Sequence, residues 1–431
     1  MNLFASVCAA FVSLLFFVGF GLAAVKFLCE TTDLGKKYSF LNRACTVREA
    51  SQSETPYAKI VLFAAAVRIL ILLAGVMICL IFQSDSSFNF EAFSTMWHKW
   101  DSTGYTNLAK IGYEYLENGE NILLVFFPLY SLCMRLMAAV LKNYYISGIF
   151  VSSVFYIGAM VYVYKLAALE FSERTAWKTI VLISVFPFSF FFGSIHTESI
   201  TLFMMAASFY YIRRQKWPIV CFFGILSALC RMVGSLVAVA ALVEYIRLYR
   251  PIHTLRERDY RKFWKEIGSK FVFIPLIAIG GLVYLGINYK VSGNPFQFLI
   301  YQESVWHNTT QFFPITLQSL FHWTFGSWDT LAGCIWIPEI LLLVLLSLFM
   351  ILRWRRLPSM YGIFMGCYIA VSYAASTLLS AGRYLSVAFP FFLLVADWAE
   401  EKEGRYVAAV VLSTVFLGIY LTAFLLNRQV M

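Results

Sequence analysis

The chain has 431 residues, of which 60% are hydrophobic, 18% are aromatic and only 13% are charged, and its mean hydropathy is +0.72. No soluble core needs this much apolar surface, so the composition excludes a soluble globular protein and predicts an all-α polytopic membrane protein. The net charge of +10 does not indicate a nucleic-acid partner, because the basic residues gather in short loops between apolar segments. Nine scattered cysteines form no C-x-x-C pair, which argues against a disulfide framework and a zinc site.

The apolar segments predict about twelve membrane spans, since roughly 18 to 20 apolar residues cross a bilayer. The spans before residue 213 are expected at 3–28, 60–82, 144–166, 177–192 and 200–212. The spans after residue 270 are expected at 271–289, 335–352, 360–378, 384–398 and 406–426. Together with the two short helices described next, this pattern places both termini outside.

Three segments need separate interpretation. Residues 217–249 have basic segments at both ends, so we expect two short helices with a break near Arg231–Ser235. Residues 126–141 carry Arg135 and are expected to lie along the outer interface as a helix that follows the first large extracytoplasmic loop. The first apolar run is too long for a signal peptide and lacks a basic start, so residues 1–57 are predicted to form an extra N-terminal span and a basic cytoplasmic loop.

Charge divides the loops between two faces of the membrane. Six acidic residues and two basic ones lie between positions 83 and 121, and positions 291–333 contain no Lys or Arg, so both segments are predicted to face outward. The excess of Lys and Arg predicts a cytoplasmic side for four other segments, which are 26–59, 213–216, 247–270 and 353–356.

Asp101 is the candidate catalytic residue. It follows Trp100 in a mostly polar outer segment between two apolar stretches. A carboxylate beside an aromatic ring, just outside a helix end, is well placed for chemistry at the membrane interface. The alternative is that Asp101 caps an interfacial helix while Trp97 and Trp100 anchor the chain at the headgroups.

Further polar residues in apolar surroundings are expected on the face that holds Asp101. Each has a simpler interpretation on its own, because Glu198 could cap the following helix and Arg383 could anchor a lipid headgroup. Their convergence on one face predicts an active site. The candidate substrate-binding residues are Trp100, His196, Glu198, Arg231, Gln302, Trp306, Arg383 and Tyr384.

Several motifs are absent. The sequence has no P-loop, no H-E-x-x-H and no D-x-D pair that would hold a metal-bound nucleotide sugar. We therefore expect no metal and no cofactor. Asn308-Thr309-Thr310 is an N-glycosylation sequon in an outer loop, which a host compartment uses only if it glycosylates.

The ordered motifs of the chain resemble those of the PIG-V family, GPI mannosyltransferase II and its bacterial relatives. His196 stands where the family usually has an aromatic residue, and the resemblance covers residues 58–431 but leaves residues 1–57 outside it. The motifs that carry it are Trp100-Asp101, Ile111-Gly112-Tyr113, Phe126-Phe127-Pro128-Leu129-Tyr130, Thr197-Glu198-Ser199, Cys230-Arg231-Met232-Val233-Gly234, Asn294-Pro295-Phe296 with Gln302 and Trp306, and Gly382-Arg383-Tyr384 to Phe389-Pro390.

The resemblance implies a GT-C type bundle of transmembrane helices over residues 58–431. It implies transfer of a sugar, mannose in this family, from a polyprenyl- or dolichyl-phosphate donor to a lipid or glycan acceptor on the extracytoplasmic face. Such a multi-pass enzyme would lie in the plasma membrane of a bacterium or in the endoplasmic reticulum membrane of a eukaryote. A partner subunit is also compatible with this family.

Residue roles follow from the resemblance and from the chemistry of one inverting displacement, which needs a single carboxylate as general base. Asp101 would take the proton of the acceptor hydroxyl, and Arg383 would bind the leaving phosphate. Arg231 and His196 would assist Arg383. The remaining candidates would contact the sugar, Glu198 and Gln302 through its hydroxyls and Trp100 or Trp306 through its face.

Two other classes of protein remain open from the sequence. A lipid or solute transporter or flippase would also need buried charges, but it usually has inverted repeats and a site near the bilayer midplane, and we see no repeat. A scaffold subunit would need none of the candidate residues. The sequence identifies neither the sugar nor the acceptor.

Overall fold

The computed structural model describes residues 3–32, 54–82, 89–114, 121–251, 254, 260–326 and 332–430. These residues fold almost entirely into helices, and the β-type pairing within them is an isolated antiparallel bridge between Thr310 and Ala375. The predicted all-α fold class is confirmed.

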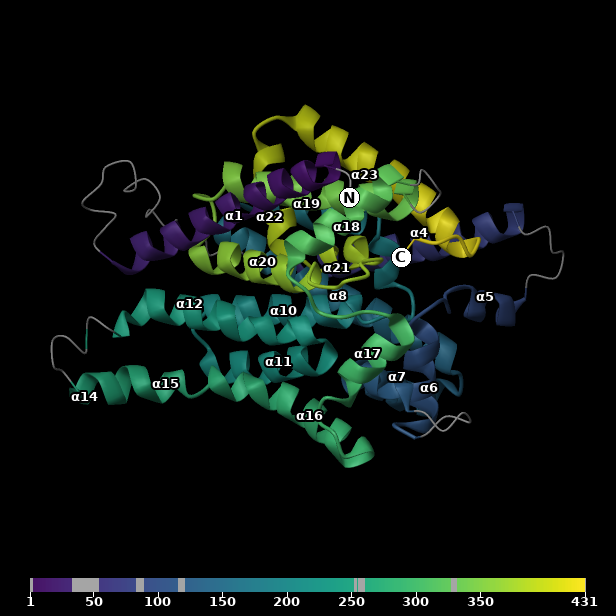
Figure 1. Ribbon diagram of the computed structural model, residues 1–431, viewed down its shortest axis with the longest axis horizontal. Coiled ribbons are helices and arrows are strands. Elements are labelled where there is room, and N and C mark those ends of the chain that lie inside the picture. The colour runs from purple at the N-terminus through teal and green to yellow at the C-terminus, as the bar shows by residue number, and fades with distance from the viewer. Residues whose placement is uncertain are drawn as a thin grey trace.

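The described helices are named as in Figure 1. In the first part of the chain they are α1 (Leu3–Thr31), α4 (Tyr57–Phe82), α5 (Phe90–Met96), α6 (Ser102–Ile111), η1 (Ile122–Val125), α7 (Pro128–Leu141), α8 (Tyr144–Glu170), α9 (Glu173–Ser184), η2 (Ser189–Phe192), α10 (Glu198–Arg213), α11 (Trp217–Cys230), η3 (Met232–Leu236) and α12 (Val237–Tyr249). In the second part they are α14 (Tyr260–Lys262), η4 (Phe263–Gly268), α15 (Ser269–Phe271), η5 (Pro275–Ile277), α16 (Ala278–Ser292), α17 (Gln297–Trp306), α18 (Phe313–Gly326), η6 (Ala332–Trp336), α19 (Ile337–Leu352), α20 (Ser359–Ser372), α21 (Ala381–Leu385), α22 (Phe389–Glu400) and α23 (Glu403–Leu425).

Seven described helices are long and apolar enough to cross a bilayer, and the chain is an integral membrane protein. The shorter apolar helices α7, α11 and α20 add to them. The prediction of about twelve spans is larger than seven because it also counts shorter segments. Three of these segments form α9, α10 and α22, which are helices of 12 to 16 residues. The seven are Leu3–Thr31, Tyr57–Phe82, Tyr144–Glu170, Met232–Tyr249, Phe263–Ser292, Ala332–Leu352 and Glu403–Leu425.

The bundle has two groups of helices, with the group of α1, α18, α19 and α20 above the group of α10, α11, α12 and α16 in Figure 1. Helix α12 packs against α20 and joins the groups. Helix α1 packs against α18, α19 and α20, and a Cβ atom on Gly366 of α20 would lie 2.1 Å from the ring of Phe20. The N-terminal helix is therefore an integral part of the bundle. The division at residue 57 remains a prediction, and residues 33–53 of its basic loop lie outside the described residues.

The expected break in residues 217–249 is confirmed. Arg231 adopts an extended backbone between α11 and η3, and α12 then returns, so that Trp217 Nε1 donates to the hydroxyl of Tyr249 over 3.0 Å. A Cβ atom on Gly234 would lie 2.0 Å from the carbonyl oxygen of Ser227, so only glycine fits this turn. The hairpin places Arg231 at the end opposite its two basic flanks.

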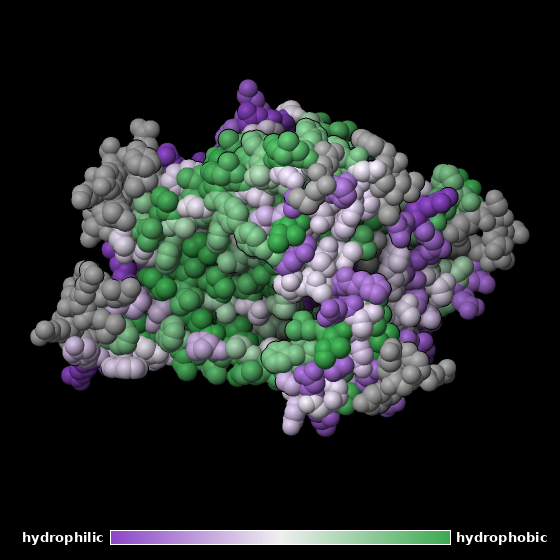
Figure 2. Space-filling view, in the orientation of Figure 1, coloured by the Kyte–Doolittle hydropathy of each residue, from purple (hydrophilic) through white to green (hydrophobic). Residues whose placement is uncertain are grey.

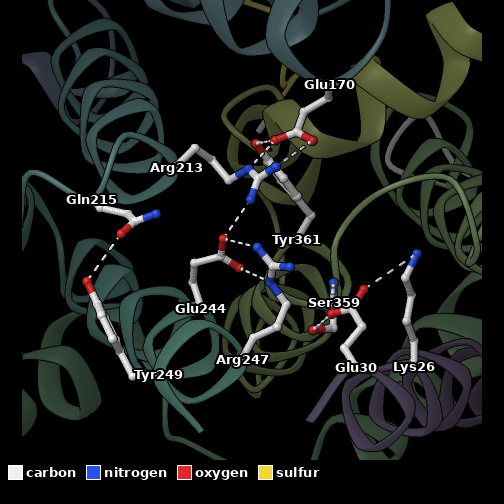
Figure 3. A network of polar contacts seen from close by, with 10 residues as sticks. All are labelled: Lys26, Glu30, Glu170, Arg213, Gln215, Glu244, Arg247, Tyr249, Ser359 and Tyr361. Carbon is white, nitrogen blue, oxygen red and sulfur yellow. Dashed lines mark hydrogen bonds and ion pairs between the residues drawn. The ribbon is translucent and has the colours of Figure 1, made fainter. Parts of the chain in front are cut away.

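The basic segments meet at one end of the molecule, where buried carboxylates pair with them (Figure 3). Arg213 bridges Glu170 and Glu244 at 2.6 Å each, and Arg247 also pairs with Glu244 at 2.6 Å. Lys26 Nζ donates to the backbone carbonyl of Arg355 over 2.8 Å. This agrees with the prediction that these segments share one side, which we call the basic end. Of the outer segment 83–121, residues 83–88 and 115–120 lie outside the described residues.

Candidate active site

Asp101 lies in the turn between α5 and α6. Its neighbour Trp100 has a positive φ of 48°, a backbone conformation that non-glycine residues rarely adopt. Asp101 occupies the N-cap position of α6, but its side chain makes no capping hydrogen bond. Instead it accepts a hydrogen bond from Arg383 Nη1 at 2.8 Å, with 27% of the side chain exposed. The geometry therefore rules out helix capping as the role of this carboxylate.

Four charged side chains alternate in sign across the site. Arg383 contacts Asp101 with Nη1 and Glu198 with Nε, the latter over 3.3 Å. Arg231 Nη1 lies 2.9 Å from the same Glu198 oxygen. Because Glu198 is 1% exposed and Arg383 5%, these ion pairs are poorly screened by water. The carboxylate of Glu198 thus holds both guanidinium groups in place.

Tyr384 lies against both arginines. The guanidinium carbon of Arg231 is 4.4 Å from the centre of its ring, and that of Arg383 is 5.1 Å away. Cation–π contacts of this kind favour the charged groups without neutralising them. Tyr384 therefore fixes the two arginines beside each other.

A cavity of about 540 Å³ opens onto this cluster. The charged side chains on its wall are Asp101, Arg231 and Arg383. Of the other predicted residues, those on the wall are Trp100, Gln302, Trp306 and Tyr384. Figure 2 shows a strongly apolar surface over α11, α12 and α20 and more hydrophilic atoms toward the side of α5, α6 and α17. The structure thus brings predicted residues from four separate stretches of chain to one cavity wall.

His196 and Glu198 lie behind the cavity wall. Both are buried, and neither side chain is among the groups that line the cavity. His196 Nδ1 is 2.9 Å from the hydroxyl of Ser194, and burial together with the nearby Arg383 lowers the pKa of His196 to about 3. The ring is therefore neutral at physiological pH. Glu198 instead contacts Arg231 and Arg383, and the predicted substrate contacts of His196 and Glu198 stay predictions.

Asp101 is ionised in this setting. Burial raises its pKa, but the charge and hydrogen bond of Arg383, with the charge of Arg231, outweigh burial and hold the pKa below its usual value. Arg383, which also lines the cavity, thus lowers the pKa of Asp101.

Neighbouring helices hold the turns that carry the site. Phe424 of α23 packs between the turn that contains Trp100 and the short helix η2. The centre of its ring is 5.2 Å from the ring centre of Trp100 and 5.7 Å from that of Phe191. Buried Arg68 of α4 donates to the backbone carbonyl of Ser189 over 2.9 Å. Buried Glu339 of α19 accepts the backbone N–H of Ala381 at 2.7 Å and so supports the turn before Arg383.

The cavity also contains residues that sequence reasoning missed as site residues. Tyr105 was within reach, since it lies in the segment that contains Asp101. Asn308 was interpreted only as part of a glycosylation sequon, whereas the residue is among those that line the cavity. Tyr368 and Gln429 sit in segments without any distinctive motif, and nothing in the local sequence indicated them.

Helix α10 separates the charged cluster from the basic end. It runs over 16 residues from Glu198 to Arg213, so its two ends lie about 24 Å apart along the helix axis. Within the described residues, no group of three or more His, Cys, Asp or Glu side chains could hold a metal ion.

Two solved structures of known proteins are distantly similar to the chain. No family model and no curated protein matches the chain. The crystal structure of ArnT from Cupriavidus metallidurans bound to undecaprenyl phosphate aligns with a TM-score of 0.48 at 10% identity, over 84% of this chain and 76% of ArnT. The archaeal oligosaccharyltransferase AglB from Archaeoglobus fulgidus, in complex with an inhibitory peptide and a dolichol-phosphate, gives 0.42 at 12% identity, over 84% and 55%.

Proposed function

We propose that the chain is a GT-C type membrane glycosyltransferase. It takes a sugar from a polyprenyl- or dolichyl-phosphate donor and transfers it to a lipid or glycan acceptor on the extracytoplasmic face. Mannose, and kinship with the PIG-V family, rest on the motif resemblance. The observation that carries the proposal is a partly exposed carboxylate, Asp101, that shares a cavity wall with the guanidinium groups of Arg231 and Arg383.

The two arginines suit the phosphate of a lipid-linked donor. Guanidinium groups bind phosphate oxygens through paired hydrogen bonds, and their charge stabilises the phosphate as it leaves. Glu198 and Tyr384 hold both groups in place before the donor arrives, so little reorganisation is needed. Exposed apolar side chains at the cavity edge, Met232 and Leu379, offer the prenyl chain a way out into the lipid.

The reaction is a single displacement. Asp101 accepts the proton of the acceptor hydroxyl while the oxygen attacks the anomeric carbon of the donor sugar. The bond from that carbon to the phosphate oxygen breaks, and its electron pair leaves with the polyprenyl phosphate beside Arg383. The anomeric configuration inverts. Trp100 and Trp306, also on the wall, offer flat surfaces for the faces of the sugar rings.

Aromatic side chains favour a sugar as the occupant over an ion or a small solute. Besides the two tryptophans, the wall carries Tyr105, Phe126 and Tyr368. A transporter or flippase would bind the same lipid but would leave the bond between sugar and phosphate intact. The two functions therefore differ in a covalent step that an assay can detect.

The test uses membranes that contain the protein, polyprenyl-phosphate mannose with a radiolabelled sugar, and extracted membrane lipids as acceptors. Transfer of the label from the carrier to a new product, absent from membranes without the protein, is the expected result. Label that crosses the bilayer while it stays on its carrier would instead establish a flippase. If mannose stays on its carrier and does not move, other polyprenyl-linked sugars take its place in the same assay.

A further inference from the structure

The end of the chain contributes to the cavity. Gln429 lines it, although this residue is far from every other site residue in the sequence. We call residues Asn427–Val430, which follow α23, the C-terminal segment.

A defined helix cap directs this segment toward the site. Asn427 has a φ of 57°, in the left-handed region that asparagine tolerates better than most residues. The N–H of Asn427 donates to the carbonyl of Phe424 at 3.2 Å, and that of Arg428 donates to the carbonyl of Ala423 at 2.8 Å. This pair of bonds is a Schellman motif, which turns the chain sharply at the helix end.

Two contacts fasten the C-terminal segment to the bundle. The side-chain oxygen of Asn427 accepts a hydrogen bond from Lys99 Nζ at 2.6 Å, and Lys99 directly precedes Trp100 and Asp101. Val430 is only 3% exposed and belongs to the hydrophobic core. Gln429 lies between these two attachments, so its position is tied to the turn that carries the candidate base.

The polar groups of the wall fall into two chemical classes. The charged groups, Asp101, Arg231 and Arg383, meet where the phosphate is proposed to bind. The others are uncharged amides and hydroxyls, which can both donate and accept and so match the hydroxyls of a neutral sugar. Apart from the tyrosine hydroxyls, they are Gln302, Asn308, Ser372, Thr377, Ser380 and Gln429.

Gln429 is exposed, whereas Arg383 is almost fully buried. Gln429 therefore borders the cavity from its solvent-exposed side, whereas the guanidinium group of Arg383 lies at its buried side. A hydroxyl-rich acceptor that enters from the extracytoplasmic side meets this part of the wall first.

We propose that the C-terminal segment forms one wall of an acceptor subsite, in which the amide of Gln429 hydrogen-bonds a hydroxyl of an uncharged sugar. This assignment rests on the proposed glycosyl transfer. It makes the last turn of the chain a determinant of acceptor affinity, with no part in donor binding.

The experiment compares Gln429→Ala with Arg428→Ala in the full-length protein. Arg428 is the matched control because it is an exposed neighbour in the same segment and does not line the cavity. Transfer from labelled polyprenyl-phosphate mannose is measured while the lipid extract is titrated at saturating donor, and then while the donor is titrated. Gln429→Ala should raise the extract concentration at half-maximal rate about two- to twelve-fold, the effect of one lost hydrogen bond. Arg428→Ala should not.

The donor KM of both variants should equal that of the wild type, and thermal unfolding should confirm that both fold. Asn427→Gly keeps the turn but removes the contact to Lys99. This variant should also raise the extract concentration at half-maximal rate. The acceptor subsite would be overturned if Gln429→Ala and Arg428→Ala reached half-maximal rate at the same extract concentration, or if only the donor KM changed. Either result would leave the proposed sugar transfer intact. Absence of transfer by the wild type with every donor tested would overturn the proposed function, and the subsite with it.

Discussion

Asp101 receives its hydrogen bond from a guanidinium group that lies 282 residues later in the chain. Arg383 thus contacts two carboxylates, Asp101 and Glu198. A donor phosphate that binds Arg383 would compete for the bond to Asp101. We expect the carboxylate then to become more basic, because the charge that lowers its pKa is partly neutralised. Donor binding would in this way prepare the base for the acceptor.

The pH dependence of kcat/KM tests the assignment of the base. A carboxylate base loses activity as the pH falls through its pKa in the free enzyme, and the pKa of Asp101 is held below the usual value of about 4. His196, with a pKa of about 3, stays neutral across the same range. We therefore expect kcat/KM for sugar transfer to show no acid limb between pH 5 and 8. A limb near pH 6 that disappears in His196→Gln would identify the histidine as the base.

Among the elements, the short helix α21 depends on a residue from α19. Glu339 accepts the N–H of Ala381, the first residue of α21, and is 2% exposed. In Glu339→Ala this buried N–H loses its partner, so the turn that positions Arg383 should loosen. The expected result is a donor KM raised about tenfold or more.

Glu339→Gln is the matched control, since its side-chain carbonyl can still accept the N–H of Ala381. It should keep a donor KM close to that of the wild type. Equal donor KM values in Glu339→Ala and the wild type would mean that α21 keeps its position without this contact.

The sequence predicted helix boundaries best where charged residues or a glycine limited the possible conformations of the chain. The hairpin of α11 and α12 follows from basic residues at both ends of one apolar run, and Gly234 permits its turn. Residues 126–141 were expected to form a helix, and α7 occupies this stretch, while its interfacial placement stays a prediction. Helix α21 and the C-terminal segment gave no periodic signal, because they are too short and their conformation depends on distant partners.

At the scale of the molecule, the buried ion pairs of the basic end connect helices from both groups. Arg213, with a side chain 9% exposed, pairs with Glu170 of α8 and Glu244 of α12, and Tyr361 of α20 also donates to Glu170. Arg213→Ala leaves two buried carboxylates without this partner, so we expect the free energy of unfolding to fall by about 3 to 5 kcal/mol. Thermal unfolding of the purified protein in detergent measures the loss.

The adjacent Arg214 is exposed and is the control for this prediction. Arg214→Ala should unfold at nearly the same temperature as the wild type. If the two variants behave alike, the buried ion pairs contribute little to holding the helices together.

The candidate site was predictable in part because membrane proteins rarely bury charge without a purpose. Asp101, Arg231 and Arg383 were identified in this way, and the structure brings them together. The sequence could not reveal that Glu198 lies behind the arginines, since a helix end does not specify which way its first side chain points. Nor could it reveal Gln429, an ordinary polar residue that only tertiary packing brings to the cavity.

Transfer by Asp101→Asn, compared with wild type and with Glu91→Gln, tests the central claim most directly. Asparagine keeps the size of the side chain but cannot accept the proton, whereas Glu91 is an exposed carboxylate in the preceding helix α5 and does not line the cavity. With equal amounts of protein, we predict that Asp101→Asn lowers the transfer rate about 10²- to 10⁴-fold and that Glu91→Gln leaves it unchanged. Transfer by Asp101→Asn at the wild-type rate would show that Asp101 is not the base.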